Sequence, residues 1–357
     1  MSDMAGNKKR IPIKRWLVLG LVALGIYTAF IGPSFLKPIS PLVVLPGEPT
    51  GLYIGDFAIT NTIAATLLTD CVLILMALSA WRFVRSGKLV PSGFYNGFEA
   101  IVEYLWNTVE GVAGKWGKRI FIVPATIFLL IFVANMIKLM PGFESIGYMK
   151  EAHGSYGFKA VELIPDRLYS IDKGQNIKNA ESHSEEAAAA ESAHAEAAES
   201  HAVGATEIND DKYYEVVPFL RGSATDINFP FALALVAVLT TQVFGVWALG
   251  LGYFEKFFQF RQLVSGGPFG AINFAVGLLE VVLEFAKILS FGFRLFGNIF
   301  AGALLLSIVG ALTAVVVPAG LYLFEVFFGI IQAYVFFLLA TMFISGATVS
   351  HHGDDHH

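Results

Sequence analysis

The sequence predicts an all-α fold, a polytopic transmembrane helical bundle whose two C-terminal helices are long, strongly tilted (near-horizontal) and joined as a hairpin. Of the 357 residues, 55% are hydrophobic and only 15% are charged, whereas a soluble domain carries about 25% charged residues. The apolar residues gather in runs close to or above the roughly 20 residues that cross a hydrocarbon core about 30 Å thick. These runs lie at about 16–32, 58–81, 120–140, 229–252, 271–309 and 311–349.

The first run is predicted to be a retained anchor with a cytoplasmic N-terminus. Basic segments stay in the cytoplasm, and this run follows Lys8, Lys9, Arg10, Lys14 and Arg15. A cleaved signal peptide is the alternative, but no convincing small-residue cleavage site precedes Pro33. Alternation places 82–119 and the C-terminus in the cytoplasm and 143–227 outside it. Without a transit-peptide pattern, we expect a multi-pass protein of the bacterial plasma membrane.

The segments between the runs have distinct compositions. Within 82–119, apolar residues from Phe94 to Val112 recur at helical spacing, which predicts an amphipathic helix that lies on the membrane surface, packs on the bundle, or does both. The stretch 179–202 is rich in Ala, Glu and His and is expected to be a solvated helix or disordered insert. A zinc-binding or pH-sensing stripe is its alternative interpretation, formed by His183, His194 and His201.

The expected organisation has five parts. They are an anchor helix and extracytoplasmic linker (1–57), first core helices with the amphipathic helix (58–142), an acidic low-complexity extracytoplasmic insert (143–227), a polar core with the tilted hairpin (228–350) and a His/Asp tail (351–357).

Several classes of function are excluded by motif. Cys71 is the only cysteine, so an intrachain disulfide and a cysteine-based metal site are impossible. No Walker loop, HExxH or GxSxG occurs, so no catalytic or nucleotide site is expected in this chain. We expect no cofactor, no metal and no nucleic-acid partner.

The last two runs are too long to stand upright in a membrane. Each has close to 40 residues, and a continuous helix of that length reaches roughly 58 Å at 1.5 Å per residue, about twice the hydrocarbon thickness. The helices must therefore tilt or break, and Pro318 and Gly320 are expected to supply the turn between them.

A polar stripe runs along the first of these two helices. Residues 271–349 hold only five charges. On a helical wheel, one narrow arc holds Glu280, Lys287, Ser290, Arg294 and Asn298, and Glu284 lies at its border. Glu325 and Gln332 share a face of the second helix. Ionisable groups at membrane depth cost at least ~2.5–3.5 kcal/mol each, so they usually mark an ion or proton path. Structural ion pairs and interhelical hydrogen bonds are the alternative interpretation.

Arg294 is the most informative residue, because an arginine cannot lose its proton to escape that cost. A permanent cation in a proton path blocks a direct leak and attracts an ionised carboxylate. Positions 290 and 298, one turn away, carry no acid, so the counter-charge is expected from another chain.

Four segments resemble the a subunit of F-type ATP synthases. In chain order they are FLLIFVANMIKLMPG (128–142), TDINFPFALAL (225–235), SFGFRLFGNIFAG (290–302) and FEVFFGIIQAYVFFLLATMFIS (324–345). The family has its corresponding segments in the same order. The resemblance covers most of 58–142 and 225–350. It implies a proton-conducting membrane stator that couples proton flow to rotation of a c-ring and to ATP synthesis.

The resemblance also implies residue roles and partners. Arg294 would face a carboxylate of the c-ring and separate two aqueous half-channels. Asn298 and Gln332 would line the path and position the arginine, while Glu280, Glu284, Lys287 and Ser290 would line the cytoplasmic half-channel. The implied partners are the c-ring, peripheral-stalk subunit b, the rest of the F0F1 complex, protons and the lipid bilayer.

Two positions depart from the family pattern. Many bacterial members have a glutamate nine residues after the arginine and a histidine seven before the glutamine, whereas this chain has Ala303 and Glu325 there. Glu325 is therefore expected to relay incoming protons. A self-contained ion transporter or channel is the main alternative, but it should show internal repeats, and we find none. A structural anchor would leave the stripe around Arg294 unexplained.

Overall fold

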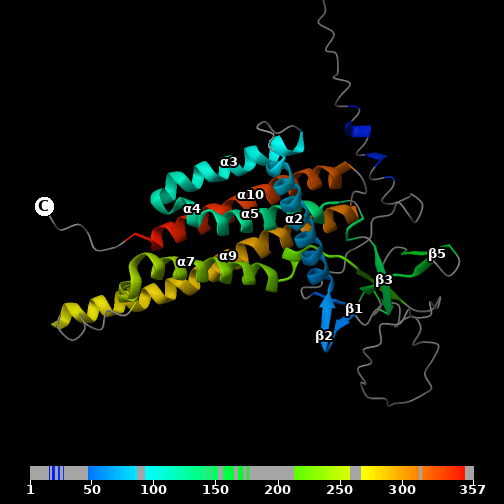
Figure 1. Ribbon diagram of the computed structural model, residues 1–357. Coiled ribbons are helices and arrows are strands. Elements are labelled where there is room, and N and C mark those ends of the chain that lie inside the picture. The colour runs from blue at the N-terminus through cyan, green and yellow to red at the C-terminus, as the bar shows by residue number, and fades with distance from the viewer. Residues whose placement is uncertain are drawn as a thin grey trace, which may run out of the picture. The chain divides into compact units, whose positions relative to one another are not determined.

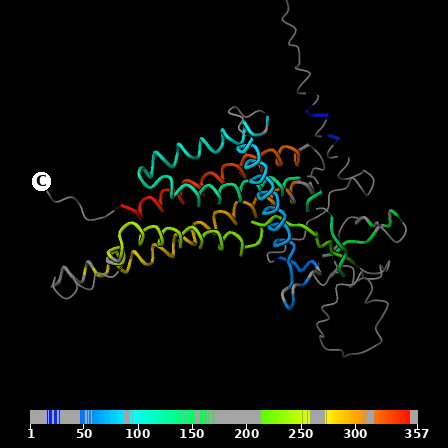
Figure 2. Tube along the Cα trace, viewed as in Figure 1, coloured from blue at the N-terminus to red at the C-terminus, as the bar shows by residue number. Residues whose placement is uncertain are grey.

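The computed structural model (Figures 1 and 2) divides into two compact units, which we describe separately. The larger unit comprises Val44–Ile146, Pro218–Ala301 and Glu325–His357, and the smaller one comprises Met1–Val43, Gly147–Val217 and Gly302–Phe324. Structure is described for residues 16, 18–20, 23–24, 27, 47–86, 93–140, 142–144, 146–151, 156–164, 168–171, 175–176, 213–257, 267–312 and 316–349. Most of the predicted anchor, the stretch 179–202 with its histidines and the tail 351–357 lie outside these residues.

Helix α2 (Asn61–Arg85) confirms the second apolar run. The Thr60 side chain caps it by accepting a hydrogen bond from the backbone N–H of Ile63. Arg82 and Arg85 occupy its last turn, where cations complement the helix dipole. Apolar side chains such as Leu75, which is 60% exposed, cover much of its surface, as expected where a helix faces lipid.

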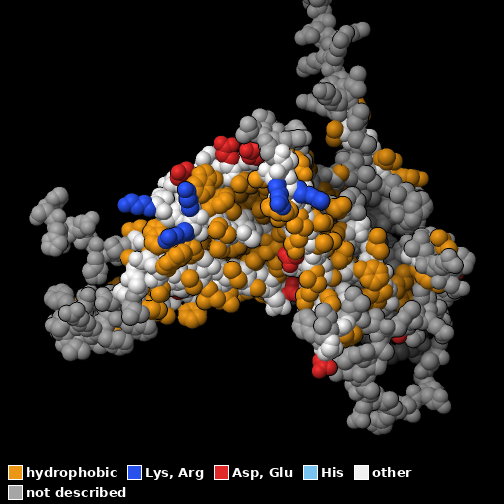
Figure 3. Space-filling model, in the orientation of Figure 1, with side chains coloured by type: hydrophobic (Ala, Val, Ile, Leu, Met, Phe, Trp, Pro, Cys, Tyr) orange, Lys and Arg blue, Asp and Glu red, His pale blue; other side chains and the backbone are white. Residues whose placement is uncertain are grey.

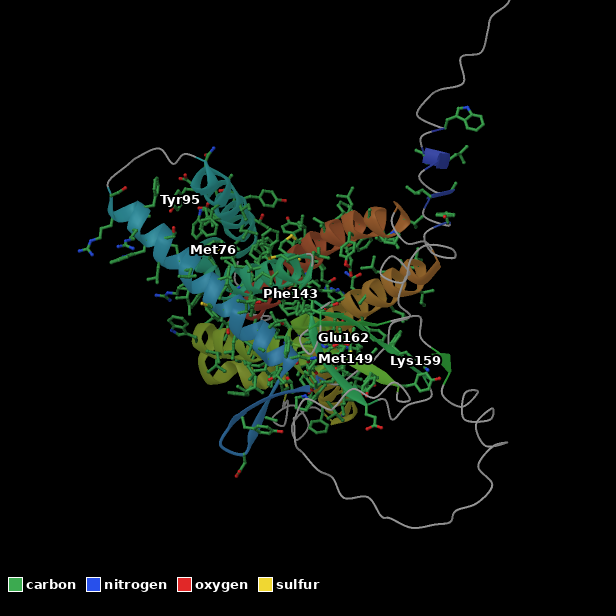
Figure 4. The ribbon with its side chains drawn as sticks, turned by 90° about the vertical axis from the view of Figure 1, so that its right-hand side faces the viewer. Met76, Tyr95, Phe143, Met149, Lys159 and Glu162 are labelled. Atoms are coloured by element: carbon green, nitrogen blue, oxygen red, sulfur yellow. The ribbon has the colours of Figure 1, made fainter. Side chains whose placement is uncertain are left out.

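The predicted amphipathic helix is α3 (Phe94–Ala113), which is followed by η2 (Gly114–Trp116), α4 (Gly117–Ile120) and α5 (Ile122–Lys138). Leu105 and Val109 of α3 are fully buried in the main core, so this helix packs on the bundle. Its N-terminal end also contacts α2, because the Tyr95 ring, labelled in Figure 4, stacks on Phe83 and its hydroxyl is 2.6 Å from the Ser79 hydroxyl.

Helix α7 (Asn228–Leu249) and the parts of α9 (Gly267–Leu312) and α10 (Val316–Ala347) that belong to the larger unit match the predicted runs. The same unit also holds two short 3-10 helices, η3 (Ser223–Thr225) and η4 (Gly250–Lys256). In the larger unit, α5, α7, α9 and α10 lie roughly alongside one another and α2 crosses them (Figure 1).

Contacts between α9 and α10 define an antiparallel hairpin. The Phe291 ring contacts Phe336 and Phe343, and the Asn298 side chain bonds to Gln332. As residue numbers rise along α9, those of the contacted residues fall along α10, so the two helices run antiparallel, and α10 has already begun at Val316. The predicted turn at Pro318 and Gly320 is therefore wrong, since both residues lie inside the first turns of α10. Proline is tolerated in a first turn because the N–H it lacks would have no helical partner.

Membrane-spanning capacity follows from length and hydropathy. In the described part of the chain, three helices are long and apolar enough to cross a membrane: Asn61–Arg85, Asn228–Leu249 and Val317–Ala347. The helical stretches Tyr95–Ile120 and Ile122–Lys138, bent by 95° relative to each other, together make a possible fourth span. Much of the face in Figure 3 is apolar, with Lys and Arg side chains gathered in a few places.

Short strands, which the sequence analysis did not anticipate, occur in both units. In the larger unit, β1 (Pro49–Ile54) and β2 (Phe57–Thr60) form an antiparallel hairpin around Gly55, whose φ of 64° suits a glycine in a tight turn. The other strands form two-stranded sheets that pair β3 (Gly147–Glu151) with β8 (Tyr214–Pro218), β4 (Tyr156–Gly157) with β7 (Gln175–Asn176), and β5 (Ala160–Ile164) with β6 (Leu168–Ile171).

Candidate functional site

Arg294 lies on the exposed face of α9 and has no acidic partner in the described part of the chain. Among the described residues its guanidinium makes one hydrogen bond, to the Ser290 hydroxyl at 3.5 Å, and no described Asp or Glu oxygen lies within 4.0 Å of it. Small residues, namely Ala286, Ser290, Gly297 and Ala301, lie on one side of it along the helix surface, whereas Lys287, Phe291 and Asn298 lie on the other. The face therefore offers an unpaired cation in a strip where another helix could approach closely.

A group of ion pairs, which we call the Lys256 cluster, lies on one side of Arg294. Lys256 Nζ is 2.6 Å from Glu280 Oε1 and 3.3 Å from Glu284 Oε1, and Lys287 Nζ is 2.8 Å from the same Glu284 oxygen. The Glu284 side chain is only 11% exposed, and its Oε2 is buried without a hydrogen-bond partner among the described residues. The cluster thus combines two ammonium groups with two carboxylates.

Local packing explains how η4 presents Lys256 to α9. Gly277 of α9 leaves no room for a side chain, because an added Cβ would be 2.7 Å from the backbone oxygen of Phe257. Gly245 of α7 likewise seats the Tyr253 ring, whose hydroxyl donates to Gln242 Oε1 at 2.8 Å. Two close backbone approaches that only glycine allows therefore hold η4 against its neighbours.

The electrostatics of η4 favour a charged lysine beside a neutral phenol. Burial would lower the pKa of Lys256, but the hydrogen bond that Lys256 donates to Glu280 and the charges of both carboxylates outweigh it, so this pKa is raised. Burial also raises the pKa of Tyr253, since it disfavours the phenolate. Tyr253 therefore remains a hydrogen-bond donor at neutral pH.

A second ion pair joins α5 to α10. Lys138 Nζ is 2.9 Å from Glu325 Oε1, with the two side chains only 7% and 14% exposed. Glu325 Oε2 is buried and has no hydrogen-bond partner among the described residues. The Asn135 amide donates to the backbone oxygen of Gly329 at 3.1 Å. Asn135 lies one turn before Lys138 in α5, and Gly329 lies one turn after Glu325 in α10. This pair is thus held beside a separate polar contact between the same two helices.

Asn298 and Gln332 form the polar contact nearest to Arg294 on the hairpin. The Asn298 amide donates to Gln332 Oε1 at 3.4 Å, and Gln332 Nε2 is buried without a partner among the described residues. The contact lies on the side of α9 that faces α10, one turn from the exposed Arg294. It therefore fixes the rotation of α9 at the level of the arginine.

The hairpin register separates the two ion-pair groups by Arg294. Arg294 lies between Phe291 and Asn298, whose contacts on α10 include Phe336 and Gln332. Glu325 comes eleven residues before Phe336, which is about 16 Å along a helix at 1.5 Å per residue. In the opposite direction, Glu284 comes ten residues before Arg294, about 15 Å along α9. An unpaired cation thus stands between two buried or half-buried sets of carboxylates.

The predicted stripe is therefore three separate arrangements rather than one chain of contacts. Glu280, Glu284 and Lys287 meet, Ser290 meets Arg294, and Asn298 meets Gln332. Lys256 and Lys138 were not predicted as site residues, because each stands at the end of an apolar run, where a lysine also has a topological explanation. Their partners lie 24 to 187 residues away, so no helical wheel brings them together.

Comparison with known proteins identifies the family of the chain. Residues 63–345 match the family described as ATP synthase A chain. The chain is 25% identical over 308 residues to ATP synthase subunit a of Mycobacterium bovis, covering 84% of this chain and 90% of that protein. A sodium-ion-specific ATP synthase subunit a of Propionigenium modestum is also 25% identical, covering 84% and 76%. ATP synthase subunit a 2 of a Bradyrhizobium strain is 33% identical over 136 residues, 38% of this chain and 56% of the relative. The chain therefore belongs to the ATP synthase A chain family, membrane-embedded subunits of the F0 sector of ATP synthase.

Proposed function

We propose that this chain carries protons to and from a c-ring through two half-channels that Arg294 keeps apart. The observation that carries the proposal is the unpaired Arg294 between two groups of membrane carboxylates. A single continuous polar path would let protons cross without turning a rotor. Two paths that end on either side of a fixed cation make each proton ride on the rotor between them.

In this proposal, Arg294 meets the ion-carrying carboxylate of the c-ring. The guanidinium stays charged at any depth, and the small residues around it allow a rotor helix to approach. Attraction between the two opposite charges at ~4 Å amounts to roughly 4 kcal/mol at an effective dielectric constant of 20. This is enough to drive the proton off the arriving carboxyl. Asn298 and Gln332 hold α9 in the rotation that presents Arg294.

During synthesis, protons arrive through Glu325 and leave past the Lys256 cluster. Glu325 offers a buried oxygen without a hydrogen-bond partner among the described residues, which suits a group that takes up and passes on a proton. On the other side, Ser290, Lys287, Glu284 and Glu280 lead toward η4. We infer that the Glu325 side is extracytoplasmic and that the Lys256 cluster faces the cytoplasm of a bacterial cell, with both chain termini cytoplasmic.

The proposed complex consists of this chain, the c-ring, peripheral-stalk subunit b and the remaining F0F1 subunits. The proposed ion is the proton, although one relative is described as sodium ion specific. Synthesis rates that do not change with sodium concentration at fixed proton gradient would support the proton, and activation by sodium would overturn that choice.

The experiment that tests the proposal is Arg294→Ala in membrane vesicles that hold the assembled complex. ATP-driven proton pumping should be abolished while c-ring and F1 still co-purify with the chain. The matched control is Arg82→Ala at the exposed end of α2, which should pump normally. Coupled pumping by Arg294→Ala at the rate of the control would overturn the proposed mechanism.

A further inference from the structure

We propose that Lys138 is a positioning residue for proton uptake, which holds one oxygen of Glu325 and leaves the other free to take the proton. The inference rests on the proposed function, because it assigns a partner to the proposed uptake residue. The observation behind it is the asymmetry of the carboxylate. Oε1 is bound by Lys138 at 2.9 Å, while Oε2 is buried and has no hydrogen-bond partner among the described residues.

The surroundings of the pair make room for the lysine. A Cβ on Gly222 would lie 2.9 Å from Lys138 Cδ, so the glycine is what allows the aliphatic part of the side chain to pass. The same Cβ position is 3.2 Å from Glu144 Oε1, which accepts a hydrogen bond from the Gly222 N–H at 2.9 Å. Glu144 Oε1 and Lys138 Cδ are therefore no more than about 6 Å apart. Glu144 therefore lies close to the aliphatic part of the same lysine side chain.

A purely structural role does not account for this lysine. The Asn135 amide already joins α5 to α10 through Gly329, one helical turn away. Two buried charges are costly to desolvate, and well-packed apolar residues often hold helices together equally well or better. The ion pair is therefore not needed to hold α5 against α10, because the Asn135 contact already does so. It does place a carboxylate in α10 with one oxygen buried and without a hydrogen-bond partner among the described residues.

The proton balance of the step is simple. A proton from the inlet water binds Glu325 Oε2, so the carboxylate becomes a neutral carboxyl and its attraction to the Lys138 ammonium weakens. The carboxyl then gives this proton to water of the half-channel, which carries it on to an ionised carboxylate of the c-ring. Glu325 becomes negative again and the ion pair with Lys138 is restored. The ammonium donates to Glu325 Oε1 and so holds the carboxylate in place without carrying the transferred proton.

Two substitutions should shift the pH dependence in opposite directions. Lys138→Gln keeps a hydrogen-bond donor but removes the charge, so Glu325 should hold its proton more tightly. Lys138→Arg keeps the charge, and its planar guanidinium can bind both carboxylate oxygens, so Oε2 should take up a proton less readily. The measurement is passive proton flux through F0 in vesicles stripped of F1, normalised to the amount of assembled complex, with the inlet pH varied.

The pH of half-maximal flux should rise by about one unit in Lys138→Gln and fall in Lys138→Arg, one unit being a tenfold change in proton affinity. Lys118→Gln, at an exposed position of α4, is the matched control and should keep the wild-type profile. Wild-type profiles in both Lys138 variants, or shifts in the same direction, would overturn the inference. If Lys138→Gln fails to assemble, Lys138→Arg alone tests the inference. If the lysine were only structural, arginine in its place would leave the pH of half-maximal flux unchanged.

Glu325→Gln separates this inference from the proposed function. If that variant conducts at the wild-type rate, the uptake role of Glu325 fails, and the role of Lys138 fails with it. If it conducts poorly while both Lys138 variants behave like wild type, only the inference about Lys138 fails. In the double variant Lys138→Gln/Glu325→Gln, the flux should be no lower than in Glu325→Gln, because the lysine acts only through that carboxylate.

Discussion

Replacing Lys256 by methionine should slow proton release, because two carboxylates would then share one region with a single remaining ammonium. Lys256 Nζ is 2.6 Å from Glu280 Oε1 and 3.3 Å from Glu284 Oε1, so these oxygens are less than about 6 Å apart. At that separation two negative charges repel by roughly 0.7 kcal/mol in water and roughly 2.8 kcal/mol at an effective dielectric constant of 20. The Glu280 and Glu284 side chains are 27% and 11% exposed. Their repulsion therefore lies between these limits, at about 1–2 kcal/mol. This corresponds to a roughly 5- to 30-fold higher proton affinity for one of the two carboxyls.

The assay is ATP synthesis in inverted vesicles, whose cytoplasmic side faces the medium, driven by an imposed proton gradient. Lys256→Met should synthesise ATP roughly 5- to 30-fold more slowly at a medium pH of about 7, and the rate should recover as the medium is made alkaline. The double variant Lys256→Met/Glu280→Gln should recover without alkali, because Glu284 then keeps Lys287 as its only charged partner.

The matched control is Lys115→Met, at an exposed position of η2, which should leave synthesis unchanged. A rate in Lys256→Met equal to that of the control would refute the reasoning. So would a slow rate that neither alkali nor the second substitution restores, since the defect would then have another cause.

Three further predictions concern the same helices. Gly245→Ala places a methyl group 2.3–2.7 Å from atoms of the Tyr253 ring and should destabilise the subunit by about 1–3 kcal/mol. The subunit should then leave the purified complex at a lower temperature. The control is Gly97→Ala, where the added methyl group meets open space. Tyr253→Phe leaves a partly buried amide oxygen of Gln242 without its donor and should destabilise by about 1 kcal/mol, in the same melting assay; an unchanged release temperature would contradict the contact. Glu325→Gln should slow ATP synthesis severely with normal assembly, and near-normal rates would show that another group takes up the proton.

The helices were predictable because they follow from apolar runs, and α2, α5, α7, α9 and α10 lie where those runs predict. The turn of the hairpin was not, because Pro318 marks either a break or a first helical turn, and only contacts across the hairpin distinguish the two. The hairpin of β1 and β2 could have been found, since Gly55 and Asp56 separate two short runs typical of strands.

The charges of the site were only half predictable. Arg294 and Glu325 stand out because each interrupts an apolar run. Lys138 and Lys256 do not, because each ends a run, and positive charge at the end of a spanning helix has an ordinary topological cause. Their ion pairs depend on the folding of α5 against α10 and of η4 against α9. Side-chain contacts of this kind between distant segments are a product of tertiary structure.

The central claim is that Arg294 keeps two proton paths apart. Passive proton flux through F0 whose rotor is covalently cross-linked to the stator tests it most directly, because only a path that bypasses rotation can then conduct. The account predicts no flux in the cross-linked wild type and a clear flux in cross-linked Arg294→Ala. A cross-linked Arg294→Ala complex that conducts no better than the wild type would contradict it.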